Sequence, residues 1–153
     1  MNNKNSNEVS IKLQSKSTNE SFARVAVSAF VCQLDPTIDE LTDIKTAVSE
    51  AVTNCIVHAY KENIGLIYIN ISLSGRKVKI KIKDKGCGIA NIEKAMEPMF
   101  TTAGSERAGL GFAVMQSFMD KLKVTSKPGV GTTVVMEKML LGRISTKNEH
   151  KNQ

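Results

Sequence analysis

The stretch from residue 67 to residue 84 most strongly limits what this chain can fold into. IYINISL at 67–73 and KVKIKIK at 77–83 alternate apolar and polar residues, which is the period of a β-strand. Ser74-Gly75-Arg76 lies between them and suits a hairpin turn. We therefore expect two neighbouring antiparallel strands in the middle of the chain.

Helical periodicity precedes and follows this hairpin. In STNESFARVAVSAFVCQL, Asn19 is the expected N-cap, and an apolar stripe is expected at Phe22, Val25, Ala26, Ala29 and Phe30. A second helix is predicted to begin near Asp39, because no Gly or Pro follows until Gly65. A short helix is expected at 91–96, and GLGFAVMQSFMDKL predicts a third main helix from Gly109.

Strands are also predicted near both ends of the chain. Val9, Ile11 and Leu13 alternate with polar residues, and residues 122–125 and 132–138 resemble a last pair of strands. Strands and helices in separate blocks predict an α+β fold. We expect a two-layer sandwich with a mixed, mostly antiparallel sheet and its helices on one face. Because the strands alternate apolar and polar residues, we expect the face of the sheet without helices to be solvent-exposed or covered by a partner.

The length of 153 residues predicts one domain, which we place at residues 8–140, with disordered tails at 1–7 and 142–153. Apolar runs are too short for a membrane span, and the N-terminus lacks the apolar centre of a secretory signal. Three widely spaced cysteines without a CxxC motif predict reduced thiols rather than disulfides or zinc. These features indicate a cytoplasmic protein without a membrane partner.

The formal net charge of +6 raises the question of an acidic partner or nucleic acid. Many lysines occupy the polar positions of one predicted strand, at Lys77, Lys79, Lys81 and Lys83. The chain has no Trp and two Tyr, so base stacking has little support. We therefore expect no direct contact with nucleic acid.

The second predicted helix carries a pair of polar residues that could act on one ligand. Glu50 and Asn54 lie four residues apart, on successive turns beside the apolar stripe. An amide oxygen can bind a hard cation, and a carboxylate can accept a proton. The helix alone favours a solvated polar face over a ligand-binding pair. His58 is expected to be structural, because no second His or Cys has the spacing of a metal site.

Glycine-rich segments supply the remaining candidates. The predicted strand ends at Asp84, which is followed by Gly86 and Gly88. A carboxylate at this place can accept a hydrogen bond from an exocyclic amine, and the glycines let a flat ligand approach the backbone. A capped tight turn would explain the same residues. Gly109 and Gly111 open a predicted helix whose free N–H groups suit phosphate. Neither pattern is specific alone.

The order of these pieces is more specific than any one of them. The pieces follow one another between residues 40 and 137 in this order: ExxxN on a helix, DxGxG after a hairpin, an aperiodic segment, GLG opening a helix, and GxGTT entering a strand. This order resembles the ATP-binding domain of gyrase-type ATPases, heat-shock 90 chaperones, sensor histidine kinases and MutL proteins. The resemblance implies a Bergerat-type ATP-binding fold.

A closer resemblance covers residues 8–138. Four of its stretches are similar to the anti-sigma F factors of spore-forming bacteria: NESFARVAVSAF, QLDPTIDELTDIKTAVSEAVTNCIVHAY, EPMFTT and ERAGLGFAVMQSFMD. That family implies a dimer that binds and inhibits a sporulation sigma factor. It also implies a kinase that uses ATP and Mg²⁺ to phosphorylate a serine of an anti-anti-sigma protein.

The resemblance also assigns roles to residues. It implies Glu50 as general base, Asn54 as Mg²⁺ ligand, and Asp84 as the adenine contact with Thr133 nearby. Gly86 and Gly88 would shape the base pocket, and Arg24 would face the protein partners. Residues 97–108 would form a lid over ATP. The lid and the segment after it add the ATP-binding candidates Ser105, Arg107, Gly109 and Gly111.

Two other functions fit the same residues. The protein could sequester a sigma factor in an ATP-dependent way without a physiological kinase activity. A histidine-kinase catalytic domain is disfavoured, because no helix pair carries a phosphoacceptor histidine and the two histidines, His58 and His150, offer no candidate.

Overall fold

A computed structural model gives the structure of the chain and describes residues 5–97 and 111–142. Five strands form one sheet in the order β1-β2-β3-β5-β4, and all four neighbouring pairs are antiparallel. The strands are β1 (Ser6–Gln14), β2 (Leu66–Ser74), β3 (Lys77–Asp84), β4 (Lys121–Lys127) and β5 (Gly131–Met139). The predicted α+β sandwich is therefore confirmed, with an antiparallel rather than a mixed sheet.

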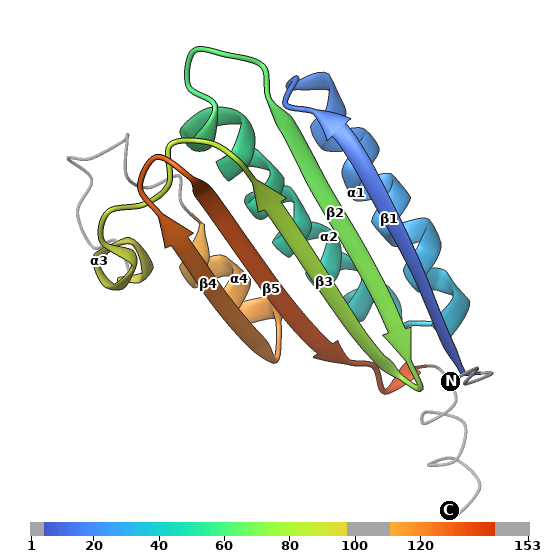
Figure 1. The fold of residues 1–153 in the computed structure, drawn as a ribbon. Helices are drawn as coiled ribbons and strands as arrows, with labels where there is room; N and C mark the ends of the chain where they lie inside the picture. The colour runs from blue at the N-terminus through green and yellow to red at the C-terminus, as the bar shows by residue number, and fades with distance from the viewer. Residues whose placement is uncertain (1–4, 98–110, 143–153) are drawn as a thin grey trace, which may run out of the picture.

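The helices pack on one face of this sheet (Figure 1). They are α1 (Thr18–Val31), α2 (Ile38–Thr53), α3 (Ile92–Met96) and α4 (Phe112–Phe118), with a 3₁₀ turn at Cys32–Leu34 and a π-helix, η2, at Asn54–Ala59. None of the helices within residues 5–97 and 111–142 is long and apolar enough to cross a bilayer.

The core lies between the helices and the inward side chains of the strands. Ile67, Ile69 and Ile71 of β2 are buried, as are Ile80 and Ile82 of β3. Each fully buried isoleucine contributes roughly 1.5–3 kcal/mol relative to an exposed one. The strict alternation fixes the register, because a slip by one residue would move the whole set to the open face.

The expected start of α1 was wrong. The helix begins at Thr18, with Ser17 at the N-cap position, and the Asn19 amide donates instead to the Gln14 carbonyl oxygen over 2.9 Å. Asn19 thereby ties the helix to the end of β1. Residues 6 and 7, expected in the loose tail, pair with β2 as part of β1.

The apolar stripe expected on α1 does not form its core-facing side. The fully buried residues are Ala23, Val27 and Val31, whereas Phe22 is 55% and Val25 61% exposed. The helix carries two adjacent apolar stripes, and the one with smaller side chains packs closely on α2. Phe30 packs partly against the core, whereas Phe22 and Val25 remain on the surface.

Helix α2 begins at Ile38, within one residue of the expected position. Its N-terminus is a capping box, in which Thr37 Oγ1 accepts from the Glu40 N–H and Glu40 Oε1 accepts from the Thr37 N–H. Glu40 also accepts from the N–H groups of Leu141 and Gly142, which follow β5. One carboxylate thus joins the start of α2 to the end of the last strand.

Candidate functional site

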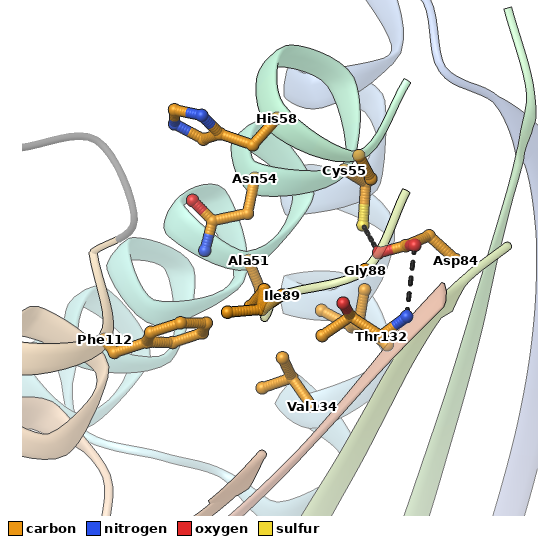
Figure 2. Close-up of a pocket in the computed structure, with 12 residues that line it drawn as sticks. Ala51, Asn54, Cys55, His58, Asp84, Gly88, Ile89, Phe112, Thr132 and Val134 are labelled. Carbon is orange, nitrogen blue, oxygen red and sulfur yellow. Dashed lines mark hydrogen bonds between the residues drawn. The ribbon is translucent and has the colours of Figure 1, made fainter. Parts of the chain in front are cut away.

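A narrow pocket opens where the end of α2, the end of β3 and the start of α4 meet (Figure 2). Its volume is about 30 Å³, so its walls must move apart to admit a heterocyclic base. Its lining combines a few polar groups with apolar walls: Ala51, Asn54, Cys55, His58, Ala59, Ile82, Asp84, Gly88, Ile89, Phe112, Thr132 and Val134.

Asp84 is the buried carboxylate of this pocket, with 5% of its surface exposed. Its Oδ1 accepts from the Gly86 N–H over 2.9 Å and from the Thr132 N–H over 3.2 Å. Its Oδ2 accepts from the Cys55 thiol over 3.6 Å (Figure 2). An ionised carboxylate oxygen accepts more than one hydrogen bond, so Oδ2 has room for a further donor such as an amine.

Burial raises the pKa of Asp84, while the N–H groups of Gly86 and Thr132 and the Cys55 thiol oppose that rise. The net direction is upward, because desolvation of the charged form outweighs the hydrogen bonds. Burial, with the nearby Asp84 charge, also raises the pKa of the Cys55 thiol well above its usual value. All three cysteines are free thiols, in agreement with the sequence prediction.

The loop after Asp84 is fixed by close packing, which explains its glycines. A Cβ on Gly86 would collide with the Ala59 carbonyl group, and one on Gly88, whose φ is +73°, would collide with the Lys127 carbonyl group. A side chain at either position would therefore meet neighbouring backbone and would not enter the pocket. Gly88 lines the pocket and Gly86 holds Asp84 through its N–H, so both shape the site indirectly.

Asn54 lies at the first position of the π-helix, where α2 changes its winding. The Tyr60 N–H donates to the Cys55 carbonyl oxygen over 3.1 Å, a hydrogen bond spanning five residues. Short π-helical segments often occur at functional sites. Figure 2 shows the Asn54 side chain over the pocket opening, between His58 and Ala51.

Glu50 lies one turn earlier, half-buried beside the start of α4. Gly111, the residue before α4, has φ +64°, and a Cβ at this position would collide with the Glu50 carboxylate. Glu50 and Arg24 also line one surface hollow of about 340 Å³ between α1 and α2. Two residues that the resemblance assigned to different tasks therefore share one surface.

Thr133 does not lie in this pocket. It pairs with Lys83 on the open face of the sheet, because residues of a strand alternate between faces. Thr132 takes the inward position, lines the pocket and shares a hydrogen bond of 2.8 Å with Ser126. The alternation of Thr132, Val134 and Met136 in the sequence could have indicated that Thr132 faces inward. No sequence pattern indicated that Cys55 contacts Asp84.

The remaining candidates lie outside the described residues: Ser105, Arg107 and Gly109, together with the predicted lid from residue 98 onward. Helix α4 is shorter than expected and ends at Phe118. Within the described ranges, no group of three His, Cys, Asp or Glu side chains could hold a metal ion.

The donor set nevertheless suits a magnesium nucleotide. The Asn54 amide and the Glu50 carboxylate offer oxygen atoms, and Mg²⁺ is usually held by one or two such groups together with substrate phosphates. Asp84 offers an acceptor to an exocyclic amine, while Ile89, Phe112 and Val134 provide apolar surface for a ring.

Comparison with known families gives one matching model, described as a histidine kinase-like ATPase domain, over residues 13–138. The chain is 58% identical to the anti-sigma F factor of Thermoanaerobacter sp. (strain X514) over 88% of this chain and 94% of the relative. It is 49% identical to that of Halalkalibacterium halodurans over 88% of this chain and 93% of the relative.

Two solved structures are similar in fold. The RsbU and RsbW domains of Rv1364c from Mycobacterium tuberculosis match with a TM-score of 0.66 and 19% identity, over 88% of this chain and 32% of that chain. The catalytic domain of the histidine kinase ThkA matches with a TM-score of 0.53 and 19% identity, over 86% of this chain and 96% of that one. At this identity the likeness concerns the fold alone.

Proposed function

The chain belongs to the histidine kinase-like ATPase domain family and, within it, to the anti-sigma F factors, and from this premise we propose that it is an ATP-dependent serine protein kinase. It binds and inhibits a sporulation sigma factor, and it phosphorylates a serine of an anti-anti-sigma protein. One observation carries the proposal: the pocket with Asn54 and Asp84 lies directly beside the surface that Glu50 shares with Arg24.

The base of ATP occupies the pocket, with its exocyclic amine donating to Asp84 Oδ2. A buried acceptor favours adenine over guanine, because guanine presents a carbonyl oxygen at the same position and would leave the carboxylate without a donor. Thr132 and Cys55 hold the carboxylate in place through the hydrogen bonds described above. Thr132 therefore takes the role that the sequence resemblance gave to Thr133.

Asn54 holds Mg²⁺ together with the phosphate oxygens, and the ion neutralises charge that develops on the transferring group. Arg107 contacts the γ-phosphate, with Ser105, Gly109 and Gly111 lining the rest of the phosphate path. Three of these four residues lie outside the described ranges, so their assignment rests on the family resemblance.

Glu50 orients the serine hydroxyl of the partner and accepts its proton. The serine oxygen attacks the γ-phosphorus, the bond between the γ-phosphorus and the β–γ bridging oxygen breaks, and ADP leaves with that electron pair. A general base of this kind typically gives about 10²–10⁴-fold in rate. The surface hollow beside Glu50 supports this role, because a protein substrate must reach the carboxylate from outside.

The protein partners dock on the exposed side of α1. Arg24 is half-exposed and forms an ion pair of 3.7 Å with Glu20, while Phe22 and Val25 present exposed apolar surface on the same helix. Charged and apolar groups in one patch are typical of protein interfaces. We assign this surface to the sigma factor and the anti-anti-sigma protein, and a homodimer to the edge strand β1.

Incubation of the full chain with γ-labelled Mg-ATP and a candidate anti-anti-sigma protein tests the proposal. We expect acid-stable phosphoserine on the partner. ATP binding without labelled partner would instead support a sequestering module that lacks kinase activity. Acid-labile phosphohistidine would overturn the serine assignment, and absence of ATP binding by calorimetry would overturn the whole scheme.

A further inference from the structure

The face of the sheet opposite the helices carries a large surplus of positive charge. Successive outward positions of β3 are Lys77, Lys79, Lys81 and Lys83, and Lys85 follows. Over the five strands and Lys85 the open face holds nine lysines and two glutamates. This surplus of seven positive charges compares with a formal net charge of +6 for the whole chain.

Part of this face is hollowed into a trough of about 530 Å³ over β1, β2 and β3. Its floor is β2, whose outward side chains Tyr68, Asn70 and Ser72 are half-buried. One wall is the lysine row of β3, and the other is β1. The two walls are separated by two strand spacings, which is about 10 Å.

The register shows which residues face each other across the trough. Lys12 and Lys83 both pair with Tyr68, and Ser10 and Lys81 both pair with Asn70. The trough is therefore basic on both walls at its Lys12 end. At the opposite end Glu8 accepts a hydrogen bond of 2.8 Å from Asn70.

Two lysines of β3, Lys81 and Lys83, are available for a partner. Of the two outward glutamates, Glu8 lines the trough but accepts its hydrogen bond from Asn70, and Glu137 lies outside the trough and forms ion pairs of 3.9 Å with Lys77 and 3.8 Å with Lys121. Among the residues the structure describes, no carboxylate lies within 4 Å of the Lys81 or Lys83 ammonium. Like charges on alternate positions of one strand repel each other, so an anionic occupant relieves that repulsion.

We infer that this trough, defined by Lys12, Tyr68, Asn70, Lys81, Lys83 and Lys85, docks an extended acidic segment of a partner protein. Alternate side chains of an extended chain are about 6.6 Å apart, which is also the spacing of alternate lysines on β3. A segment with an acidic residue at every second position can therefore place its carboxylates along the lysine row. Asn70 on the floor and Ser10 on the β1 wall provide polar contacts between them.

Other occupants fit this trough less well. A second copy of the chain would bring the same positive face against it. Single-stranded nucleic acid needs aromatic platforms, and in the described part of the trough the Tyr68 ring is the one such group, with the Lys85 ammonium 5.3 Å from its centroid. An anionic membrane would bind lysines, but this trough has no exposed large apolar side chain to insert. The inference does not depend on the nucleotide site on the opposite face.

A labelled peptide of about ten residues that alternates glutamate and alanine is a suitable probe, with alternating glutamine and alanine as the neutral control. We expect fluorescence anisotropy to detect binding to the full chain at about 50 mM salt and a strong loss at about 300 mM, because exposed charges are screened. The double variant Lys81→Glu/Lys83→Glu should weaken binding by about tenfold or more.

The matched control is Lys121→Glu/Lys123→Glu, which makes the same charge change on β4, outside the trough. We expect it to keep the peptide affinity within about threefold, and both variants to keep their affinity for Mg-ATP. Equal losses in the two variants would mean general attraction to a basic protein and would overturn the inference. Tighter binding of a single-stranded oligonucleotide or of anionic phosphatidylserine vesicles than of the acidic peptide would also overturn it.

Discussion

The Cys55 thiol donates a hydrogen bond to Oδ2 of Asp84 over 3.6 Å, between residues 29 positions apart in the chain. The other oxygen of Asp84 is held by two backbone N–H groups. The thiol thus fixes the orientation of the oxygen that we assign to the adenine amine. We therefore propose that Cys55 is a positioning residue for base recognition rather than a catalytic one.

Replacing Cys55 tests this relationship. Cys55→Ala removes the donor, and we expect the affinity for Mg-ATP to fall by about fivefold in calorimetry, since a thiol is a weak donor to a charged acceptor. Cys55→Ser keeps a donor and should stay within about twofold of the native chain. Inosine triphosphate, which lacks the amine, should bind equally weakly to all three proteins. Equal ATP affinity in the alanine variant would remove Cys55 from base recognition.

Glu50→Ala is expected to separate catalysis from binding. Transfer of labelled phosphate to the partner serine should fall by about 10²–10⁴-fold, because the hydroxyl loses its proton acceptor, while the affinity for ATP stays unchanged. Glu62→Ala, at an exposed carboxylate in the loop before β2, is the matched control and should retain full activity. A Glu50 variant with native transfer rate would contradict the general-base role.

Gly111→Ala probes the contact between α4 and Glu50. Gly111 has φ +64°, so alanine adds backbone strain of about 1 kcal/mol, and its methyl group also displaces the Glu50 carboxylate. Gly75→Ala has similar strain, with φ +58°, but open space around the position. We expect both variants to lose similar stability in urea unfolding and the Gly111 variant alone to lose kinase activity. Normal activity in both would show that Glu50 tolerates displacement.

Arg24→Glu should weaken binding to the sigma factor and to the anti-anti-sigma protein while leaving the ATP affinity unchanged. The substitution replaces a partly exposed i,i+4 ion pair with Glu20 by two like charges, so it should lower the free energy of unfolding by about 1 kcal/mol at most. Lys61→Glu makes the same charge change in the loop before β2 and serves as control. Surface plasmon resonance with each partner provides the measurement, and native partner affinities in the Arg24 variant would exclude this residue from both interfaces.

Glu40 should make stability depend on pH. Burial raises the pKa of Glu40, but hydrogen bonds from the N–H groups of Thr37, Leu141 and Gly142 outweigh it and hold the pKa below its usual value of 4.5. A lowered pKa stabilises the fold above that value, and the contribution is lost as pH falls through the folded pKa. Glu40→Gln should cost about 1–2 kcal/mol of unfolding free energy at pH 7, with a smaller difference below pH 4. A constant difference across this range would contradict the prediction.

The alternation of single strands already predicted much of the fold. The β2–β3 hairpin follows from residues adjacent in sequence, because alternation and a glycine turn are local properties. The start of α2 and its uninterrupted course were predicted for the same reason. These elements placed Glu50, Asn54 and Asp84 on the correct segments, and the order of motifs then indicated the family.

Faces and partners across the sheet were harder to predict. Both apolar stripes of α1 fit a core helix, and the tertiary packing buried the one with Ala23, Val27 and Val31. Thr132 rather than Thr133 faces inward because of the register between β5 and β3, which are segments about fifty residues apart in the chain.

The sequence by itself determined the order of the main elements and the family to which the chain belongs, because periodicity, turn residues and motifs act over a few positions. The tertiary structure alone decided that a thiol supports Asp84, that Glu50 and Arg24 share a surface, and that the lysines gather on one open face. Such contacts arise when distant segments pack together, and the free energy of that packing is a property of the whole core.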